Sequence, residues 1–449
     1  LVSALWAMSS LGGPPYFQAE TEAAVTILIR CLASAAVSAA PSSDSAATSA
    51  PSPPAGGGGG LTGWQAGQVL WALGNSRHAT QRLPDLEASL LRSGGLPYMH
   101  PRDVTRVLWG FASLGYSPER LLLTIRPDWS WRGRTASESV HKGKGKGSKA
   151  RGKDMKGSGG GSGLEVQGDV RSFSPQQLAC AVWALAVMGK VDTGPFRSAW
   201  AQLLRRAANV PPAEPVMTQI WQANLAVHLE SSSSSPTPKS SSLRASATSA
   251  SPIPIDGTVT TASALSSRPG SRGTGGCGSK AGNAAAASSE DLTAAGLAAA
   301  AGAGGGLNVA AARSLLLRAR DVFLTATSAL RRKVQSGYQR QMANTLTGLR
   351  MMHLLEDNSA GYSIDITLPQ LRIALEADGP THASRTPSGA VLGATAMKRR
   401  HLQRMGWHVI NVTYKEWDRL TSESARRAFL QERINEALLS RIQIDDNEG

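Results

Sequence analysis

The chain has 449 residues and carries 47 lysines and arginines against 32 aspartates and glutamates, a formal net charge of +15. This balance favours a polyanionic partner, the alternative being that the charge only keeps the chain soluble. The three cysteines, Cys31, Cys180 and Cys277, lie too far apart to indicate a disulfide framework or a zinc site. No apolar run approaches the length of a membrane span. Leu1 falls inside a helical pattern, so we expect an N-terminally truncated chain whose targeting peptide is not visible.

Tryptophan-centred segments recur along the first half of the chain. Trp71 and Trp109 are 38 residues apart, and Trp183 and Trp221 are again 38 apart. Apolar residues recur at helical spacing within each segment. A fixed period of helical pieces predicts an α-helical solenoid of helical-pair repeats of about this length. The segments are 2–12, 66–74, 104–115, 178–189 and 216–226.

Each repeat needs a second helix, which we predict at 83–92 and 196–207, for example. The recurrent L-W-A-L core resembles the octatricopeptide repeat of green-algal organellar proteins and the helical region of FAST-kinase-like mitochondrial proteins. This resemblance covers about residues 1–230 and implies binding of single-stranded RNA. We interpret the tryptophans themselves as core residues and expect the RNA contacts on polar helix positions.

Composition separates folded from low-complexity parts. Residues 38–60 are rich in Ala, Ser, Pro and Gly, and 132–163 contain the run H-K-G-K-G-K-G-S-K-A-R-G-K. Neither can bury a core, although the basic run could add affinity for phosphates. The expected organisation is helical repeats at 1–37, 61–131 and 164–230, a low-complexity insertion at 38–60, a basic disordered insertion at 132–163, a disordered linker at 231–306, a basic helical segment at 307–356 and a C-terminal domain at 357–441.

The segment 309–352 is predicted to form two or three helices. It contains eight basic residues, opposed only by Asp321, and includes the run Arg331, Arg332 and Lys333. Such a bias indicates either a solvated helical face or an RNA-binding surface, and we favour the second.

Two alternating runs, 363–368 and 371–377, predict a β-hairpin with a tight turn at Pro369-Gln370. If residues 368 and 371 pair, Asp365 and Glu376 become diagonal neighbours on one face. Residues 397–405 predict a short basic helix, 407–414 a third strand, 415–420 the start of a helix and 424–439 an amphipathic helix that packs on the sheet.

These C-terminal residues resemble the RAP domain, an RNA-binding domain abundant in apicomplexans and found in organellar proteins. The resemblance implies a small α/β fold and RNA as the partner. The family in turn resembles the restriction-endonuclease-like fold, in which acidic residues on strands hold a divalent metal. The matching motifs are I-D-I at 364–366, A-L-E-A-D-G-P-T-H at 374–382, L-G-A-T-A-M-K-R-R-H-L at 392–402, G-W-H-V-I at 406–410 and Y-K-E-W at 414–417.

Three carboxylates form a candidate catalytic and metal site. Asp365, Glu376 and Asp378 could bind Mg²⁺ or Mn²⁺, with Lys398 or His382 as the base or cation beside a scissile phosphate. The E-x-K lysine of the larger fold is absent, because Asp378 takes its place. The alternative is that Asp365 and Glu376 are structural and pair with arginines of the basic helix.

The candidate RNA-binding residues are basic and lie around that helix and in the preceding helical segment. Guanidinium groups match the geometry of phosphates well. These residues are His382, Lys398, Arg399, Arg400, Arg404, Arg331, Arg332 and Lys333.

We therefore expect an organellar RNA-binding factor of the mitochondrion or chloroplast that acts in transcript stability, processing, splicing or translation. The repeats would grip single-stranded RNA and the RAP domain would add contacts, with RNA-processing or ribosome-associated proteins as further partners. Binding would require no cofactor. The alternative is a Mg²⁺- or Mn²⁺-dependent endoribonuclease that uses Asp365, Glu376 and Asp378. A purely protein-binding scaffold leaves the positive charge without a purpose.

Overall fold

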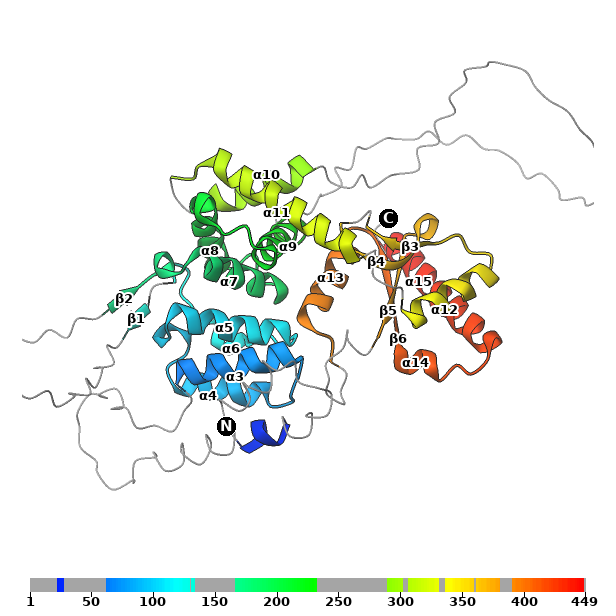
Figure 1. Cartoon of the computed structure of the whole chain (residues 1–449), viewed down its shortest axis with the longest axis horizontal. Coiled ribbons are helices and arrows are strands. Elements are labelled where there is room, and N and C mark those ends of the chain that lie inside the picture. The colour runs from blue at the N-terminus through cyan, green and yellow to red at the C-terminus, as the bar shows by residue number, and fades with distance from the viewer. Residues whose placement is uncertain are drawn as a thin grey trace, which may run out of the picture. The chain divides into compact units, whose positions relative to one another are not determined.

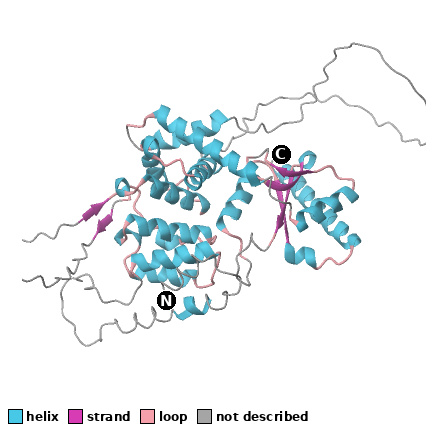
Figure 2. Ribbon diagram, in the orientation of Figure 1, coloured by secondary structure: helices cyan, strands magenta, loops and turns pink. Residues whose placement is uncertain are grey.

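The computed structural model describes residues 22–27, 62–129, 131–133, 166–231, 289–301, 306–330, 336–358, 361–379 and 390–447. Most of these residues are helical, and four strands near the C-terminus form a mixed sheet (Figures 1 and 2). Within these ranges, no helix combines the length and the apolar character that crossing a bilayer requires.

Four helices each carry one of the predicted tryptophans: α3 (Gly63–Ser76), α5 (Pro101–Ser113), α7 (Pro175–Val187) and α9 (Glu214–Glu230). Their starts follow from the sequence. Thr62 and Ser174 form capping boxes with glutamines three residues later, and prolines occupy the first turns of α5, α7 and α9, where no intrahelical N–H is lost. The predicted segment 2–12 lies outside the described residues.

The tryptophan helices pack side by side in chain order, α3 on α5, α5 on α7 and α7 on α9. Contacts join nearly equivalent positions of neighbouring helices, so the helices run parallel. The thiol of Cys180 on α7 donates to the carbonyl of Thr105 on α5 at 3.9 Å. Trp183 Nε1 donates to Gln222 Oε1 on α9 at 2.8 Å. The 38-residue spacing of the sequence separates neighbours α3 and α5, and α7 and α9, whereas the tryptophans of α5 and α7 are 74 residues apart and the basic insertion lies between them.

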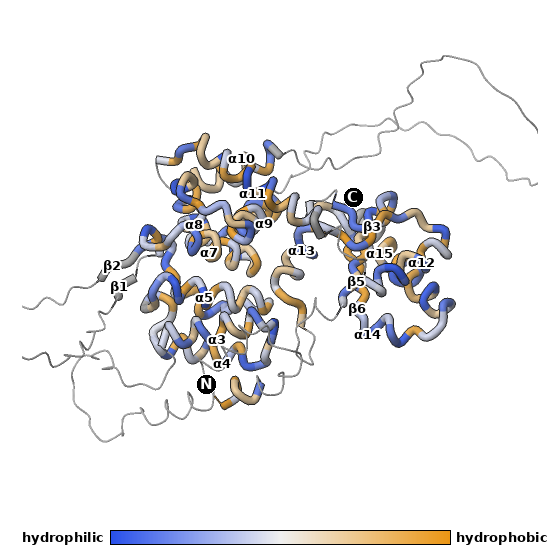
Figure 3. The backbone as a smooth tube through the Cα atoms, viewed as in Figure 1, coloured by the Kyte–Doolittle hydropathy of each residue, from blue (hydrophilic) through white to orange (hydrophobic). Residues whose placement is uncertain are grey.

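The connecting helices form a second layer. Helix α4 (Leu83–Arg92) has the predicted bounds, α8 (Gly194–Arg205) begins two residues earlier than predicted, and α6 (Glu119–Leu122) is a single turn. Hydrophobic and hydrophilic residues alternate along these helices (Figure 3). Trp183 and Trp221 are buried core residues, as expected, whereas Trp71 and Trp109 remain partly exposed.

The predicted disordered linker 231–306 was wrong at its C-terminal end, because residues Ser289–Ala301 form helix α10. Trp200 Nε1 donates to the carbonyl of Gly296 at 2.8 Å, and Asn224 Nδ2 donates to the carbonyl of Leu292 at 3.0 Å. A Cβ atom on Gly296 would lie 2.0 Å from Asn224 Oδ1. The alanine- and glycine-rich composition that suggested a linker is what permits this close approach to α8 and α9. Residues 232–288 lie outside the described ranges.

The two insertions lie almost entirely outside the described residues. At the base of the basic insertion, β1 (Trp131–Gly133) pairs with β2 (Val166–Gly168) in an antiparallel ladder. The segment 307–356 contains α11 (Val309–Leu330) and α12 (Gly337–Gly348), as predicted, but it ends in a strand, β3 (Leu354–Asp357). The boundary predicted at 357 was therefore wrong, because β3 belongs to the C-terminal sheet.

The C-terminal sheet has the order β3-β4-β5-β6. Strand β4 (Ile364–Leu368) is antiparallel to β3 and to β5 (Ile373–Asp378), and β5 is parallel to β6 (His408–Thr413). Helix α13 (Gly393–Arg404) connects β5 to β6 and covers one face of the sheet, with Met397 and Leu402 in the core. The other face packs against α12, α14 (Tyr414–Asp418) and α15 (Glu423–Asn447), whose Leu430 and Ile434 are fully buried.

The predicted hairpin is present, but its register differs from the expected one. Leu368 pairs with Ile373 rather than with residue 371, because Pro369–Leu371 form a 3₁₀ turn and Arg372 adopts φ 55°. The shift of two residues keeps every side chain on its predicted face. Continuing this register places Asp365 directly opposite Glu376 instead of diagonally.

Candidate functional site

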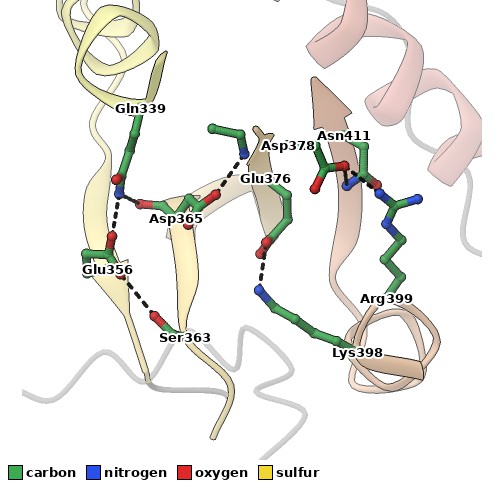
Figure 4. A network of polar contacts seen from close by, with 10 residues as sticks. Gln339, Glu356, Ser363, Asp365, Glu376, Asp378, Lys398, Arg399 and Asn411 are labelled. Carbon is green, nitrogen blue, oxygen red and sulfur yellow. Dashed lines mark hydrogen bonds and ion pairs between the residues drawn. The ribbon is translucent and has the colours of Figure 1, made fainter. Parts of the chain in front are cut away.

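The three predicted carboxylates gather where β4 and β5 face α13 (Figure 4). Asp365 Oδ2 accepts the backbone N–H of Ala377 at 2.8 Å. Glu376 Oε2 accepts a hydrogen bond from Lys398 Nζ at 2.6 Å. Asp378 Oδ2 accepts from Arg399 Nη2 at 2.5 Å and from Asn411 Nδ2 at 2.9 Å. The structure therefore brings the predicted acids and two predicted cations together, each acid with its own donor.

Gln339 of α12 fixes the position of β4, the strand that carries Asp365. Gln339 Nε2 donates to Glu356 Oε1 at 2.8 Å and to the carbonyl of Asp365 at 2.9 Å, and Ser363 Oγ donates to Glu356 Oε2 at 3.0 Å (Figure 4). These bonds tie β3, β4 and α12 together, so the position of Asp365 depends on elements that precede the domain boundary predicted from sequence.

Glu376 lies in the interior of this cluster. Its side chain is buried, and burial raises its pKa to about 7; repulsion from Asp365 and Asp378 adds to the rise, and Lys398 offsets part of it. Its second oxygen, Oε1, is buried and accepts no hydrogen bond in this structure. A carboxyl in this state exchanges its proton near neutral pH, which is the range that acid–base chemistry requires.

In this structure each of the three carboxylates accepts a hydrogen bond from a donor of the protein itself. In the described ranges, no three or more His, Cys, Asp or Glu side chains form a group that could hold a metal ion. An ammonium group lies on Glu376 and a guanidinium group on Asp378, in positions that a cation ligated by both acids would need. The alternative pairing of Asp365 and Glu376 with arginines is not seen: Glu376 pairs with Lys398, Arg399 pairs with Asp378, and Asp365 accepts the backbone N–H of Ala377.

The basic helix α13 lies against the C-terminal ends of the tryptophan helices. Its first residue, Gly393, approaches the last turn of α5 so closely that a Cβ atom would lie 1.8 Å from the carbonyl oxygen of Ala112. Only glycine permits this contact. Helix α13 also packs on α7 and α9.

Two predicted RNA-binding arginines of α13 are bound to these helix ends. Arg400 donates from Nη2 to the carbonyl of Ala186 at 2.8 Å and from Nη1 to that of Val187 at 3.3 Å. Arg404 Nη1 donates to the carbonyl of Leu229 at 2.8 Å. The last carbonyls of a helix have no partner within it and carry the negative end of its dipole, so cations stabilise them. Arg400 and Arg404 therefore cap the C-terminal ends of α7 and α9.

A chain of hydrogen bonds connects Arg400 through Glu230 and His401 to Tyr362. Arg400 Nε donates to Glu230 Oε1 at 2.9 Å, and His401 Nε2 contacts the same oxygen at 2.9 Å. Burial would raise the pKa of Glu230, but hydrogen bonds from His401 and Arg400 lower it overall, whereas burial lowers the pKa of His401. Neutral His401 therefore donates from Nε2 to ionised Glu230 and accepts at Nδ1 from the Tyr362 hydroxyl, 2.8 Å away.

The remaining predicted RNA-binding residues, His382, Arg331, Arg332 and Lys333, lie outside the described residues. Sequence reasoning missed Glu230 and Tyr362, which are far from α13 in the chain. Glu230 is the last residue of α9, where a carboxylate is unfavourable next to the helix dipole unless a cation pairs with it. The position of this carboxylate at a helix C-terminus could have predicted that a cation from another part of the chain pairs with it.

Fold and site together define a class: a small α/β domain whose mixed four-stranded sheet holds paired carboxylates beneath a basic helix. The family model described as the RAP domain matches residues 375–433, from β5 into α15. This part of the chain is a RAP domain, as the sequence predicted.

One relative is a protein of Oryza sativa subsp. japonica named "RAP domain-containing protein, chloroplastic". It is 32% identical to this chain over 99 residues, which make up 22% of this chain and 15% of the relative. The match thus spans a small part of both proteins. The resemblance of the tryptophan segments to octatricopeptide repeats stays a prediction.

Proposed function

We propose that this protein is a chloroplast RNA-binding factor that acts in post-transcriptional RNA metabolism. The observation that carries the proposal is the RAP domain at 375–433, because this domain is generally an RNA-binding domain. The rice relative named as chloroplastic supports the chloroplast rather than the mitochondrion as the organelle. The net charge of +15 suits a polyanionic partner.

We also propose that the tryptophan helices form a helical-repeat array that holds single-stranded RNA. The row of parallel helices supports this part of the proposal. Neighbouring tryptophan helices pack on one another in chain order, as neighbouring units do in a helical solenoid. Transcript stabilisation, processing, splicing or translation would follow from such binding, with RNA-processing or ribosome-associated proteins as later partners. Binding itself would require no cofactor.

The direct test is crosslinking of the full chain to chloroplast transcripts, followed by sequencing of the bound RNA. We expect enrichment of a small set of transcripts and an affinity that falls steeply as salt rises, because neutralised phosphates release counterions. Absence of RNA binding at low salt would contradict the proposal.

A second candidate is the Mg²⁺- or Mn²⁺-dependent endoribonuclease, with the restriction-endonuclease-like fold as its scaffold. One observation favours it: buried Glu376, with its pKa raised to about 7, faces Asp365 and contacts Lys398. Purified protein would be incubated with a bound transcript and Mn²⁺, beside Asp365→Ala and Glu376→Ala variants. Cleavage that both changes abolish supports the nuclease. Cleavage indifferent to them, or none, leaves binding without chemistry.

A further inference from the structure

Helix α12 lies outside the residues that the RAP family model matches, but it belongs to the same folded unit. Met342 and Leu346 of α12 are fully buried in the core that also contains residues of the strands and of α15. Gln341 Oε1 accepts a hydrogen bond from Trp417 Nε1 of α14 at 2.8 Å. Helices α12 and α13 lie on opposite faces of the sheet (Figure 1). The surface that α12 presents is therefore a second outer surface of the C-terminal domain.

The exposed side of α12 is polar and basic. No aspartate or glutamate occurs between Gly337 and Gly348. Arg340 and Asn344 are exposed and four residues apart, so they lie on the same side of the helix. Arg350 is exposed two residues beyond the helix end. This helix thus brings positive charge to the surface without an acid of its own to neutralise it.

A further cation lies beside the first turn of α12. The ring of Tyr338 lies 6.5 Å from that of Tyr414 on α14, centroid to centroid, and Lys415 Nζ lies 6.0 Å from the centroid of the Tyr414 ring. Lys415 is exposed. Asp418, on the same short helix, accepts a hydrogen bond from the Tyr338 hydroxyl at 3.0 Å. We name this surface the α12 face, and it consists of Arg340, Asn344, Arg350 and Lys415.

The arginines of the α12 face differ from most other cations of the C-terminal half. Of the basic residues predicted in 309–352, two on α11 pair with acids. The four cations of α13 all have acceptors within the fold. Within the described ranges, Arg340 and Arg350 make no ion pair and no side-chain hydrogen bond. A ligand from outside the chain can therefore bind their guanidinium groups without breaking a contact of the fold.

We propose that the α12 face binds the sugar–phosphate backbone of RNA, with Arg340, Arg350 and Lys415 on phosphate groups and Asn344 on a ribose hydroxyl. Side chains of these types contact the backbone of nucleic acids without reading its sequence. This inference rests on the proposed RNA-binding function and names the surface by which the C-terminal domain takes part in it. That surface lies on a helix outside residues 375–433 and across the sheet from the basic helix α13.

The test measures how the affinity of the full chain for a labelled single-stranded RNA of mixed sequence depends on salt. Each phosphate contact that is lost lowers the slope of log affinity against log salt by about 0.7. The double variant Arg340→Gln/Arg350→Gln should therefore show a slope smaller by about 1.4, and an affinity at low salt at least about five-fold weaker. Its melting temperature should not change, because both side chains are exposed.

The matched control is the double variant Arg92→Gln/Arg318→Gln. It removes the same charge from exposed sites on α4 and α11, outside the α12 face. Its slope should equal that of the unaltered chain. A slope that stays the same in the α12 double variant, or that falls equally in the control, overturns the inference while RNA binding itself persists.

A charge added to the face gives a second measurement. Asn344→Asp places a carboxylate one turn from Arg340 and should weaken RNA binding about five-fold or more at low salt. Asn435→Asp is the control, since Asn435 is exposed on α15 next to Glu436. Equal affinities of the two variants overturn the inference, as does an Asn344→Asp variant that loses a protein partner but binds RNA normally. If the unaltered chain binds no RNA, the proposed function fails instead.

Discussion

The tryptophan helices and the C-terminal sheet domain use their polar residues in opposite ways. The sheet domain turns its acids and bases inward: Glu376 pairs with Lys398, Asp378 with Arg399, and Glu230 at the end of α9 with Arg400. The helix row keeps an apolar interior and leaves its variable polar residues on one surface. The comparison teaches that the cations of a basic helix can be taken up by acceptors within the fold. Buried carboxylates and helix C-termini compete for the same cations.

The largest effect that sharpens this comparison is expected from Arg400→Ala. The change leaves Glu230, only 5% exposed, without its guanidinium partner and uncaps two carbonyls of α7. Breaking a buried pair in this way costs about 3 kcal/mol. Denaturant unfolding of the full chain measures the loss. A change below about 1 kcal/mol would mean that Arg400 is not a structural residue of the junction and is free to bind RNA.

The second-largest expected effect is the pH dependence that Glu376 confers on the free energy of unfolding. Because folding raises its pKa from 4.5 to about 7, its contribution to stability is fully present below pH 4.5 and is lost as pH rises through 7. Glu376→Gln removes this dependence. The difference in free energy of unfolding between the two proteins should change by about 2 kcal/mol between pH 5 and pH 8. Equal pH profiles would show that the carboxyl is not buried as described.

Gly296→Ala tests the packing of α10 on the helix row. The added Cβ meets fully buried Asn224, so we expect a loss of about 1 to 2 kcal/mol. Gly337→Ala in α12 is the matched control, since nothing lies within 4 Å of its Cβ position. Similar thermal unfolding of both variants would indicate that α10 does not dock on α9.

The smallest effect is expected from Arg404→Ala. This arginine donates a single hydrogen bond, to the carbonyl of Leu229 at an exposed site, and such bonds contribute less than about 1 kcal/mol. Because its side chain is the most open of the α13 cations that cap helix ends, its loss should leave folding nearly unchanged. A large drop in RNA affinity with normal unfolding would show that Arg404 contacts RNA.

Local pattern was enough to predict most of the elements. The need for a second helix in each repeat predicted α4 residue for residue, alternation predicted β4 and β5, and the β-branched and aromatic residues of 407–414 predicted β6. The short strand β3 was missed because it lies at the sheet edge, with only half-buried or exposed residues and no clear alternation. Helix α10 was missed because alanine and glycine fill linkers and closely packed helices alike.

The sequence by itself predicted that Asp365 and Glu376 share a face, and the prediction held because the register differs from the expected one by two residues, which leaves each side chain on its face. It also determined the period of the tryptophan helices. Only the tertiary structure decided which acceptors the cations of α13 meet, because Arg400, Val187 and Glu230 are joined by folding rather than by spacing. A charge pattern specifies that a partner is needed, and the choice between a buried carboxylate, a helix end and RNA depends on what folding places within a few ångströms.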